Sequence, residues 1–178
     1  MQCTSCQAHT LQPKELEKGL VGASCPNCEG LLLSLINYRY WVERNTADMS
    51  PSSDEELLIE EEGGARICPK CARLMTKYRM SAKAENRIDL CTGCDEAWLD
   101  KDEWHLLKRL DIATTMTSIF TDHWQRQIST DQRISKLKAR YQELLGEEDF
   151  VVLDRFKEWL DKHPNQEEIK RYINASLK

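Results

Sequence analysis

Residues 91–103 read Cys-Thr-Gly-Cys-Asp-Glu-Ala-Trp-Leu-Asp-Lys-Asp-Glu, and residues 68–71 read Cys-Pro-Lys-Cys. Each stretch contains a pair of cysteines with two residues between them, and 19 residues separate the two pairs. Such a pair places both sulfurs on one side of a tight loop, and two pairs joined by a hairpin of about 15–20 residues bring four thiolates to the corners of a tetrahedron. The sequence therefore predicts one metal site made by Cys68, Cys71, Cys91 and Cys94.

The same pattern occurs once earlier in the chain. Two cysteine pairs separated by 18 residues predict a second site made by Cys3, Cys6, Cys25 and Cys28. Residues 25–30, Cys-Pro-Asn-Cys-Glu-Gly, correspond to residues 91–96 at an offset of 66. We interpret this correspondence as an internal duplication of one small module. Two closed sites would hold two zinc ions per chain.

Zinc is preferred here over other uses of paired cysteines. A module this small buries too little surface to fold unaided, and a structural zinc ion supplies about 10–16 kcal/mol of apparent binding energy. A redox cysteine pair of the thioredoxin sort usually occurs once, at a helix N-terminus. Iron in a rubredoxin-like site is an alternative because its cysteine spacing is similar. His9 lies close to Cys6 and is an alternative ligand, although four cysteines already complete the first site.

Over residues 68–103 the chain resembles the transcription factor IIB-type zinc-ribbon family of bacterial proteins. In that family the second cysteine pair is followed by Gly, an aromatic residue, Leu, Asp and a Glu that starts a helix. The resemblance implies a zinc ribbon whose ligands are Cys68, Cys71, Cys91 and Cys94. It also implies that the ribbon packs on the following helix through Trp98, Leu99, Asp100 and Glu103. A link to transcription is implied only weakly.

Two departures from the family pattern follow the cysteines. Glu96 stands where the family has glycine, so we expect a different turn there, because that position often needs a permissive backbone. The first module keeps Gly30 but has Leu32-Leu33-Ser34 in place of Trp-Leu-Asp, and its match is weaker. Together with the Tyr40-Trp41 pair and a helical tail, the chain resembles a recurrent two-ribbon arrangement in that group.

The sequence contains little that supports catalysis. Both predicted sites are closed by four protein ligands, whereas a catalytic zinc keeps one position open for water. The histidines are His9, His105, His123 and His163, and they form no His-Glu-x-x-His motif. A Gly-rich phosphate loop and a nucleophile elbow are also missing. We therefore expect a protein that is not an enzyme, with a thiol-based redox sensor or an enzyme as the alternative.

Charge and composition divide the chain into four parts. These are a first zinc ribbon (1–44), an acidic linker (45–64), a second zinc ribbon (65–100) and an α-helical region (101–178). Residues 1–100 carry 11 Lys and Arg against 16 Asp and Glu, residues 101–178 carry 14 of each, and the net charge is −5. A protein that coats DNA would be basic. No membrane span and no signal peptide are visible, so we expect a cytoplasmic protein in which thiols stay reduced.

The segment after residue 100 has the periodicity of amphipathic helices. Five helices are predicted around the apolar sets Trp104, Leu107 and Leu110; Met116, Ile119, Phe120, Trp124 and Ile128; Ile134, Leu137, Tyr141 and Leu144; Phe150, Leu153, Phe156 and Leu160; and Ile169, Tyr172, Ile173 and Leu177. Asp100 with Glu103 predicts an N-cap, and Gly146 predicts a helix end. If Leu137 lies in a bundle core, Leu137→Asp should unfold the bundle.

The predicted fold class is therefore a small zinc-stabilised α+β protein. Two zinc ribbons, each a short β-hairpin, are followed by an α-helical C-terminal bundle. Because each module has its own four cysteines, we expect Cys71→Ser to remove one zinc and to leave the first site loaded.

Positive charge is concentrated in the second module, which carries Lys70, Arg73, Lys77, Arg79, Lys83 and Arg87. Several of these residues can share one face of the hairpin with Tyr78, and that face would bind phosphates or an acidic protein surface. The alternative is that this face of the hairpin is simply exposed to solvent. Residues 37–44, Asn-Tyr-Arg-Tyr-Trp-Val-Glu-Arg, place aromatic rings beside arginines. That pattern suits base stacking, a protein hot spot or packing between the ribbons.

We expect a macromolecular interaction or adaptor module with a protein partner. Direct binding of nucleic acid by the second ribbon is the alternative. A further hypothesis concerns the six carboxylates of the linker, which are Asp54, Glu55, Glu56, Glu60, Glu61 and Glu62. Tethered a few residues before the basic face, they would cover it and compete with a polyanion.

Overall fold

A computed structural model describes residues 1–45 and 64–175 of the chain. The chain divides into two compact units, Met1–Thr130 and Asp131–Lys178. Both cysteine modules lie in the first unit. The linker hypothesis falls on carboxylates that lie outside the described residues.

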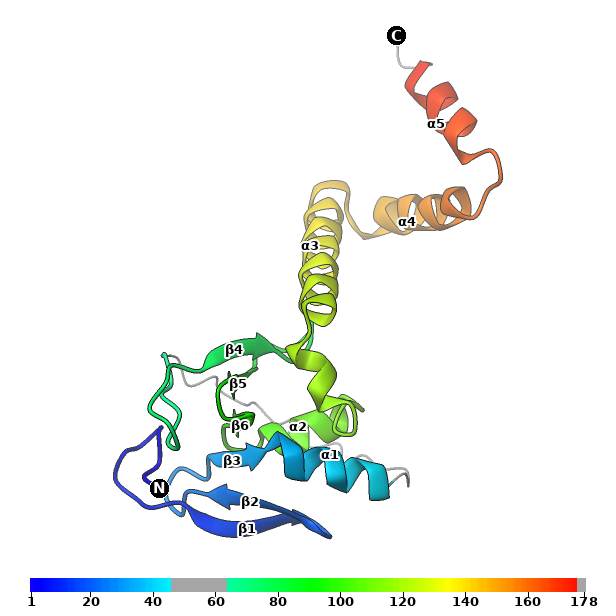
Figure 1. Cartoon of the computed structure of the whole chain (residues 1–178). Coiled ribbons are helices and arrows are strands. Elements are labelled where there is room, and N and C mark those ends of the chain that lie inside the picture. Colours follow the sequence, from blue (N-terminus) through cyan, green and yellow to red (C-terminus); the bar gives the residue numbers. More distant parts are fainter. Residues whose placement is uncertain (46–63, 176–178) are drawn as a thin grey trace. The chain divides into compact units, whose positions relative to one another are not determined.

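The first unit is built on one antiparallel sheet of six strands (Figure 1). The strands are β1 (Gln12–Glu17), β2 (Leu20–Ser24), β3 (Leu31–Ser34), β4 (Thr76–Arg79), β5 (Arg87–Cys91) and β6 (Glu96–Leu99). Their order across the sheet is β1-β2-β3-β6-β5-β4. Each cysteine module therefore supplies three neighbouring strands rather than a hairpin alone, and β3 joins β6 in the middle. The observed class is a mixed α+β fold.

The pairing of β3 with β6 relates the two modules by a local twofold axis. Leu31 pairs with Leu99, and Leu32 pairs with Trp98. The register continues with Leu33 opposite Ala97 and Ser34 opposite Glu96. At the offset of 66, Leu32 is also the residue that corresponds to Trp98 in the duplicated sequence. Equivalent residues thus face each other, as they do at the centre of a symmetric dimer.

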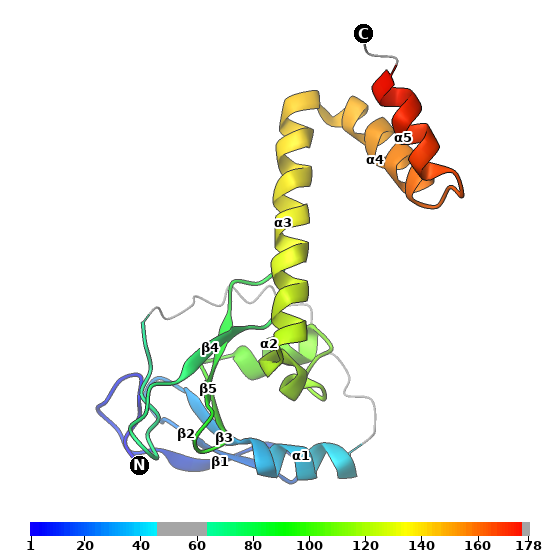
Figure 2. The same ribbon diagram turned by 45° about the horizontal axis from the view of Figure 1, so that its top comes forward.

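Helices cover one face of this sheet (Figure 2). Each third strand leads into a helix: β3 into α1 (Leu35–Arg44), and β6 into α2 (Glu103–Arg109) followed by the 3-10 helix η1 (Met116–Phe120). Because strand side chains alternate, Leu33 and Leu99 point to these helices. Trp41 and Trp104 meet edge to face with ring centroids 6.0 Å apart, so each module contributes one ring to the shared core.

Three further helices follow, α3 (Asp122–Leu145), α4 (Glu147–Asp161) and α5 (Gln166–Ala175). The second and third predicted helices were wrong as separate elements. Residues 116–120 form the short 3-10 helix, and a single helix then runs from Asp122, because that segment contains neither glycine nor proline. Gly146, with a φ of 80°, ends α3 as predicted. None of the described helices combines the length and the apolarity that a membrane crossing needs.

The side chains predicted as a bundle core are largely exposed. Ile134, Leu137 and Tyr141 keep 42%, 48% and 43% of their surface accessible, and Leu144 keeps 71%. The expectation that Leu137→Asp would bury a carboxylate is therefore wrong for a single chain. The second unit contains helices. Among its described residues, however, most apolar side chains that were predicted to form the bundle core are exposed rather than packed against other side chains.

Candidate metal centre

The structure brings together both predicted sets of four cysteines. In each set the four sulfurs lie within 4.8 Å of one another. The pairs Cys3–Cys28, Cys6–Cys25 and Cys71–Cys91 are each separated by 3.5 Å between sulfurs. A disulfide would need about 2.05 Å, whereas four sulfurs around a zinc ion lie roughly 3.8 Å apart, given Zn–S bonds of about 2.3 Å. Both groups thus have the arrangement of a tetrahedral metal site.

The loops that carry the first cysteine pairs are built alike. The Cys3 N–H donates to the His9 carbonyl, and the Cys68 N–H donates to the Arg73 carbonyl, both at 2.8 Å. Within each loop, the N–H of the second cysteine also donates to the sulfur of the first. Backbone N–H groups directed at sulfur stabilise thiolates, the form that binds metal.

A left-handed residue follows every cysteine pair. These residues are Gln7, Glu29, Ala72 and Asp95, with φ between 53° and 58°. This conformation turns the chain back after each second cysteine. The left-handed position in the second module is Asp95, which corresponds to Glu29 in the first, so the two turns are alike and the expectation of a different turn at Glu96 is wrong. Glu96 instead lies buried in β6, where its carboxylate accepts from Lys70 Nζ at 2.7 Å.

Gly30 is required by a close approach rather than by its backbone angles. A Cβ atom at this position would lie 2.3 Å from Cζ2 of Trp98. The glycine therefore lets the edge of the indole approach the backbone of the other module closely. This explains why the first module keeps a glycine where the second has Glu96.

The two cysteine groups share one small apolar cluster on the sheet face opposite the helices. Its buried members are Cys3, Leu11, Cys25, Leu32, Cys68, Met75, Cys91 and Trp98. Trp98 is fully buried and belongs to the central pair of the twofold relation. Thr4, which lies between Cys3 and Cys6, also donates a hydrogen bond from its hydroxyl to the carbonyl of Ile67, which precedes Cys68. The metal sites are therefore neighbours in one packed region.

The ionisation of the thiols fits a site that is completed by a cation. Burial raises the pKa of Cys3 to about 12. The backbone N–H of Ala8 lowers the pKa of Cys6 to about 5, and that of Arg73 lowers the pKa of Cys71 to about 7. Within a group, some thiols thus ionise readily and others resist ionisation, because several negative charges would be buried close together. A soft divalent cation removes this conflict by neutralising the thiolates.

His9 lies beside the first group without completing it. The described residues that could hold a metal are the eight cysteines, in two groups of four. The His9 side chain hydrogen-bonds to the sulfur of Cys6, an interaction that lowers the pKa of that thiol. His9 is thus placed to support a ligand.

The chain matches no protein-family model, no curated protein and no solved structure. Function is therefore inferred from the residues of the site.

A buried charge cluster beside Trp98 was missed by the sequence analysis. Arg66 lies over the indole, 5.7 Å from the ring centre, with its Nε 3.2 Å from Asp89 and its Nη2 2.6 Å from Asp100 Oδ2. The Trp98 Nε1–H donates to Asp100 at 2.9 Å. The Asp100 N–H donates to Glu103 Oε2 at 2.8 Å, but α2 begins at Glu103 with Asp102 as its N-cap, so the prediction of Asp100 as the N-cap is wrong. The available signal was Asp89, a charged residue between the apolar residues Ile88 and Leu90 of β5.

The six basic residues of the second module do not form one free face. Lys70 pairs with Glu96, and Lys77 lies 3.5 Å from Asp89. Tyr78 packs edge to face on Phe120 at 5.3 Å. Arg73 and Lys83 are exposed, while Arg79 and Arg87 are half-buried.

The aromatic residues of the first module have separate surroundings. Trp41 is buried in the core, where its Nε1–H donates to the Lys18 carbonyl at 3.2 Å, whereas Tyr40 is exposed. Packing between the modules thus accounts for Trp41.

Proposed function

We propose that this chain is a non-enzymatic zinc protein that binds two structural zinc ions and presents a surface to a macromolecular partner. The observation that carries the proposal is the pair of four-sulfur groups, each spanning no more than 4.8 Å. Thiolate ligands in a tetrahedron suit zinc and iron, and zinc is the usual occupant of sites with four cysteines. The resemblance to the transcription factor IIB-type zinc ribbon supports the same metal.

The role we propose for zinc is structural. Each group supplies four protein ligands, which leaves no position for a reacting water. The metal instead holds the cysteine loops in place around Trp98 and Leu32, where the two modules meet. Zinc thereby creates a fixed protein surface, which is what an adaptor needs.

A protein partner is preferred over nucleic acid. The chain has a net charge of −5, and two of the six basic side chains in the second module are held by Glu96 and Asp89. Exposed apolar residues beside the cysteine loops, Ile67 and Leu74, suit a protein contact.

Nucleic acid binding is the second candidate, and one observation favours it. Arg79 lies directly opposite Arg87 in the β4–β5 ladder. Two guanidinium groups on one face of the sheet suit contact with the phosphates of a polyanion. A link to transcription would follow from this candidate most directly.

Elemental analysis of the purified protein tests the metal. We expect two zinc ions per chain in a colourless protein, whereas an iron site would be coloured. A content near zero or one would contradict the two-site proposal.

A gel-shift titration separates the two partner classes. The double variant Arg79→Gln/Arg87→Gln should leave protein binding unchanged if the partner is a protein. If the partner is nucleic acid, its affinity should fall, and the affinity of the unaltered protein should fall steeply with salt.

A further inference from the structure

The C-terminal part of α3 carries an apolar seam with basic borders. Ile134, Leu137, Tyr141 and Leu144 recur at alternating spacings of three and four, the a and d positions of a heptad. All four are exposed in the single chain. The positions that border this seam hold Arg133, Lys138 and Arg140. This helix therefore presents an apolar stripe between positive charges.

Helix α4 carries the complementary arrangement. Phe150, Leu153 and Leu160 lie on one seam, in which Lys157 takes the remaining position. The bordering positions hold Asp149, Asp154 and Asp161. Its seam is thus bordered by negative charges.

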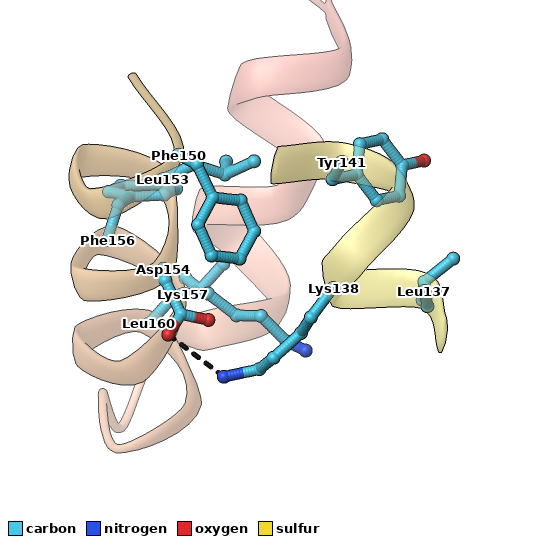
Figure 3. A pocket seen from close by; sticks show the side chains of 9 residues that line it. All are labelled: Leu137, Lys138, Tyr141, Phe150, Leu153, Asp154, Phe156, Lys157 and Leu160. Atoms are coloured by element: carbon cyan, nitrogen blue, oxygen red, sulfur yellow. Dashed lines mark hydrogen bonds and ion pairs between the residues drawn. The ribbon is translucent and has the colours of Figure 1, made fainter. Parts of the chain in front are cut away.

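The two seams meet at a groove of about 260 Å³ (Figure 3). Leu137 and Tyr141 line it from α3, and Phe150, Leu153 and Phe156 line it from α4. One ion pair already joins the borders, since Lys138 Nζ lies 2.9 Å from Asp154. Within one chain, the basic border of α3 therefore already contacts the acidic border of α4.

A second apolar stripe on α4 is also left in water. Val152, Phe156 and Trp159 keep 67%, 39% and 50% of their surface exposed. Together with the four residues of the α3 seam, this makes seven exposed large apolar side chains on a unit of fewer than fifty residues. Exposed apolar surface of this extent marks a site of association.

We propose that two copies of this chain associate through the groove and seams of residues 131–161. A twofold axis would place the basic α3 seam of each copy beside the acidic α4 seam of the other. The product is a four-helix arrangement in which positive and negative helices alternate around an apolar centre.

Charge complementarity favours a second copy as the occupant. One unit carries both an acidic and a basic seam, so its surface is complementary to itself under a twofold rotation. A purely acidic or purely basic partner would match one helix and repel the other. Residues 131–178 carry 10 positive and 10 negative side chains, so the unit that makes the proposed contact has no net charge.

Sedimentation equilibrium of the full, zinc-loaded chain tests the association. Across about a hundredfold range of concentration, the mass should rise from 20.7 kDa towards twice that value. Leu144→Gln should weaken the dimer by about tenfold or more, because its side chain lies on the seam yet is exposed in one chain. Ile36→Gln is the matched control, since Ile36 is also an exposed apolar side chain and lies on the first unit. A chain that remains monomeric throughout would overturn the proposal.

Reversing the charges on one helix tests whether α3 of one copy pairs with α4 of the other copy. Arg133→Glu/Arg140→Glu makes both helices acidic, and Asp149→Lys/Asp161→Lys makes both basic. All four positions are exposed. Each variant alone should be monomeric, and an equimolar mixture should form a heterodimer. Circular dichroism before mixing reports whether the helices are kept. A mixture that stays monomeric while both variants remain helical would contradict pairing between copies.

Discussion

Gly30 is the single residue that most directly controls how the two modules fit. Its Cα faces the Trp98 ring, and its carbonyl accepts from the Cys25 N–H at 2.8 Å. Gly30→Ala would push a methyl group into a fully buried indole, and overpacking of this kind costs about 1–3 kcal/mol. We expect a lower urea midpoint and faster loss of zinc. Gly93→Ala is the control, because its Cβ would meet only the flexible Arg73 side chain. Equal midpoints for the two variants would refute the argument.

Glu103 makes stability depend on pH. Burial raises its pKa from 4.5 to about 8, with Asp100 and Asp89 nearby and Asn86 as a hydrogen-bond partner. Between these two values the folded protein keeps a proton that the unfolded chain has lost. The resulting stabilisation is complete below pH 4.5 and is lost as the pH rises through 8.

Glu103→Gln tests this dependence, because an amide copies the protonated acid. The free energy of unfolding of the unaltered protein should fall between pH 6 and pH 8.5 relative to that of the variant. Zinc loss at low pH affects both proteins and cancels in the difference. Glu85→Gln, at an exposed position, should behave as the unaltered protein does. A constant difference across the range would show that Glu103 is already ionised.

Residue identity predicted which cysteines lie together but not their supporting neighbours. Cysteine spacing alone locates all eight sulfurs, because the loop geometry is local. The left-handed position at Asp95 and the Arg66–Asp89 pair depend on strand register and on a chain segment distant in sequence. A single sequence carries no signal for contacts of that kind beyond an unexpected charge between two apolar residues of a strand.

Among the elements, helices were predicted better than strands. Gly146 and Pro164 mark the ends of α3 and α4 because their effects on the backbone are local. The join between β3 and β6 was not predictable, since nothing in either strand specifies its partner. The exposed α3 stripe was mistaken for core because periodicity shows which face is apolar and not what covers it.

The continuity of α3 through residues 122–145 is open to a direct test. Thr130 lies in its interior, where a proline removes a backbone hydrogen bond and costs about 3 kcal/mol. Thr130→Pro should therefore lower helicity and expose the neighbouring amides to hydrogen exchange. Thr130→Ala should not reduce either. If proline were tolerated without change, two separate helices joined near this residue would describe the segment better.

At the scale of the molecule, the first unit resembles a dimer fused into one chain. Glu29 and Asp95 are equivalent residues at the offset of 66, and each pairs with the other module: Glu29 with Lys101 at 2.6 Å, and Asp95 with Arg39 at 3.2 Å. Exposed pairs like these contribute about 0–1 kcal/mol, so they orient the modules more than they hold them. Burial of apolar side chains from both modules on the two faces of the sheet supplies the main attraction.

This shared cluster couples the two metal sites, which changes the expectation for a lost ligand. Cys71→Ser removes one of the four thiolates of the second site and frees the loop that holds Ile67. The first site then loses the packing of Trp98 and the Thr4–Ile67 hydrogen bond. Residues in contact couple by about 0.5–3 kcal/mol, so we expect the remaining zinc to be released to a chelator about tenfold faster than from the intact protein. Cys6→Ser should have the reciprocal effect on the second site, because coupling free energies are mutual. Leu32→Ala, which keeps all eight cysteines, should reduce the coupling. Release of the remaining zinc at the unaltered rate in both cysteine variants would show that the modules bind their metals independently despite the common sheet.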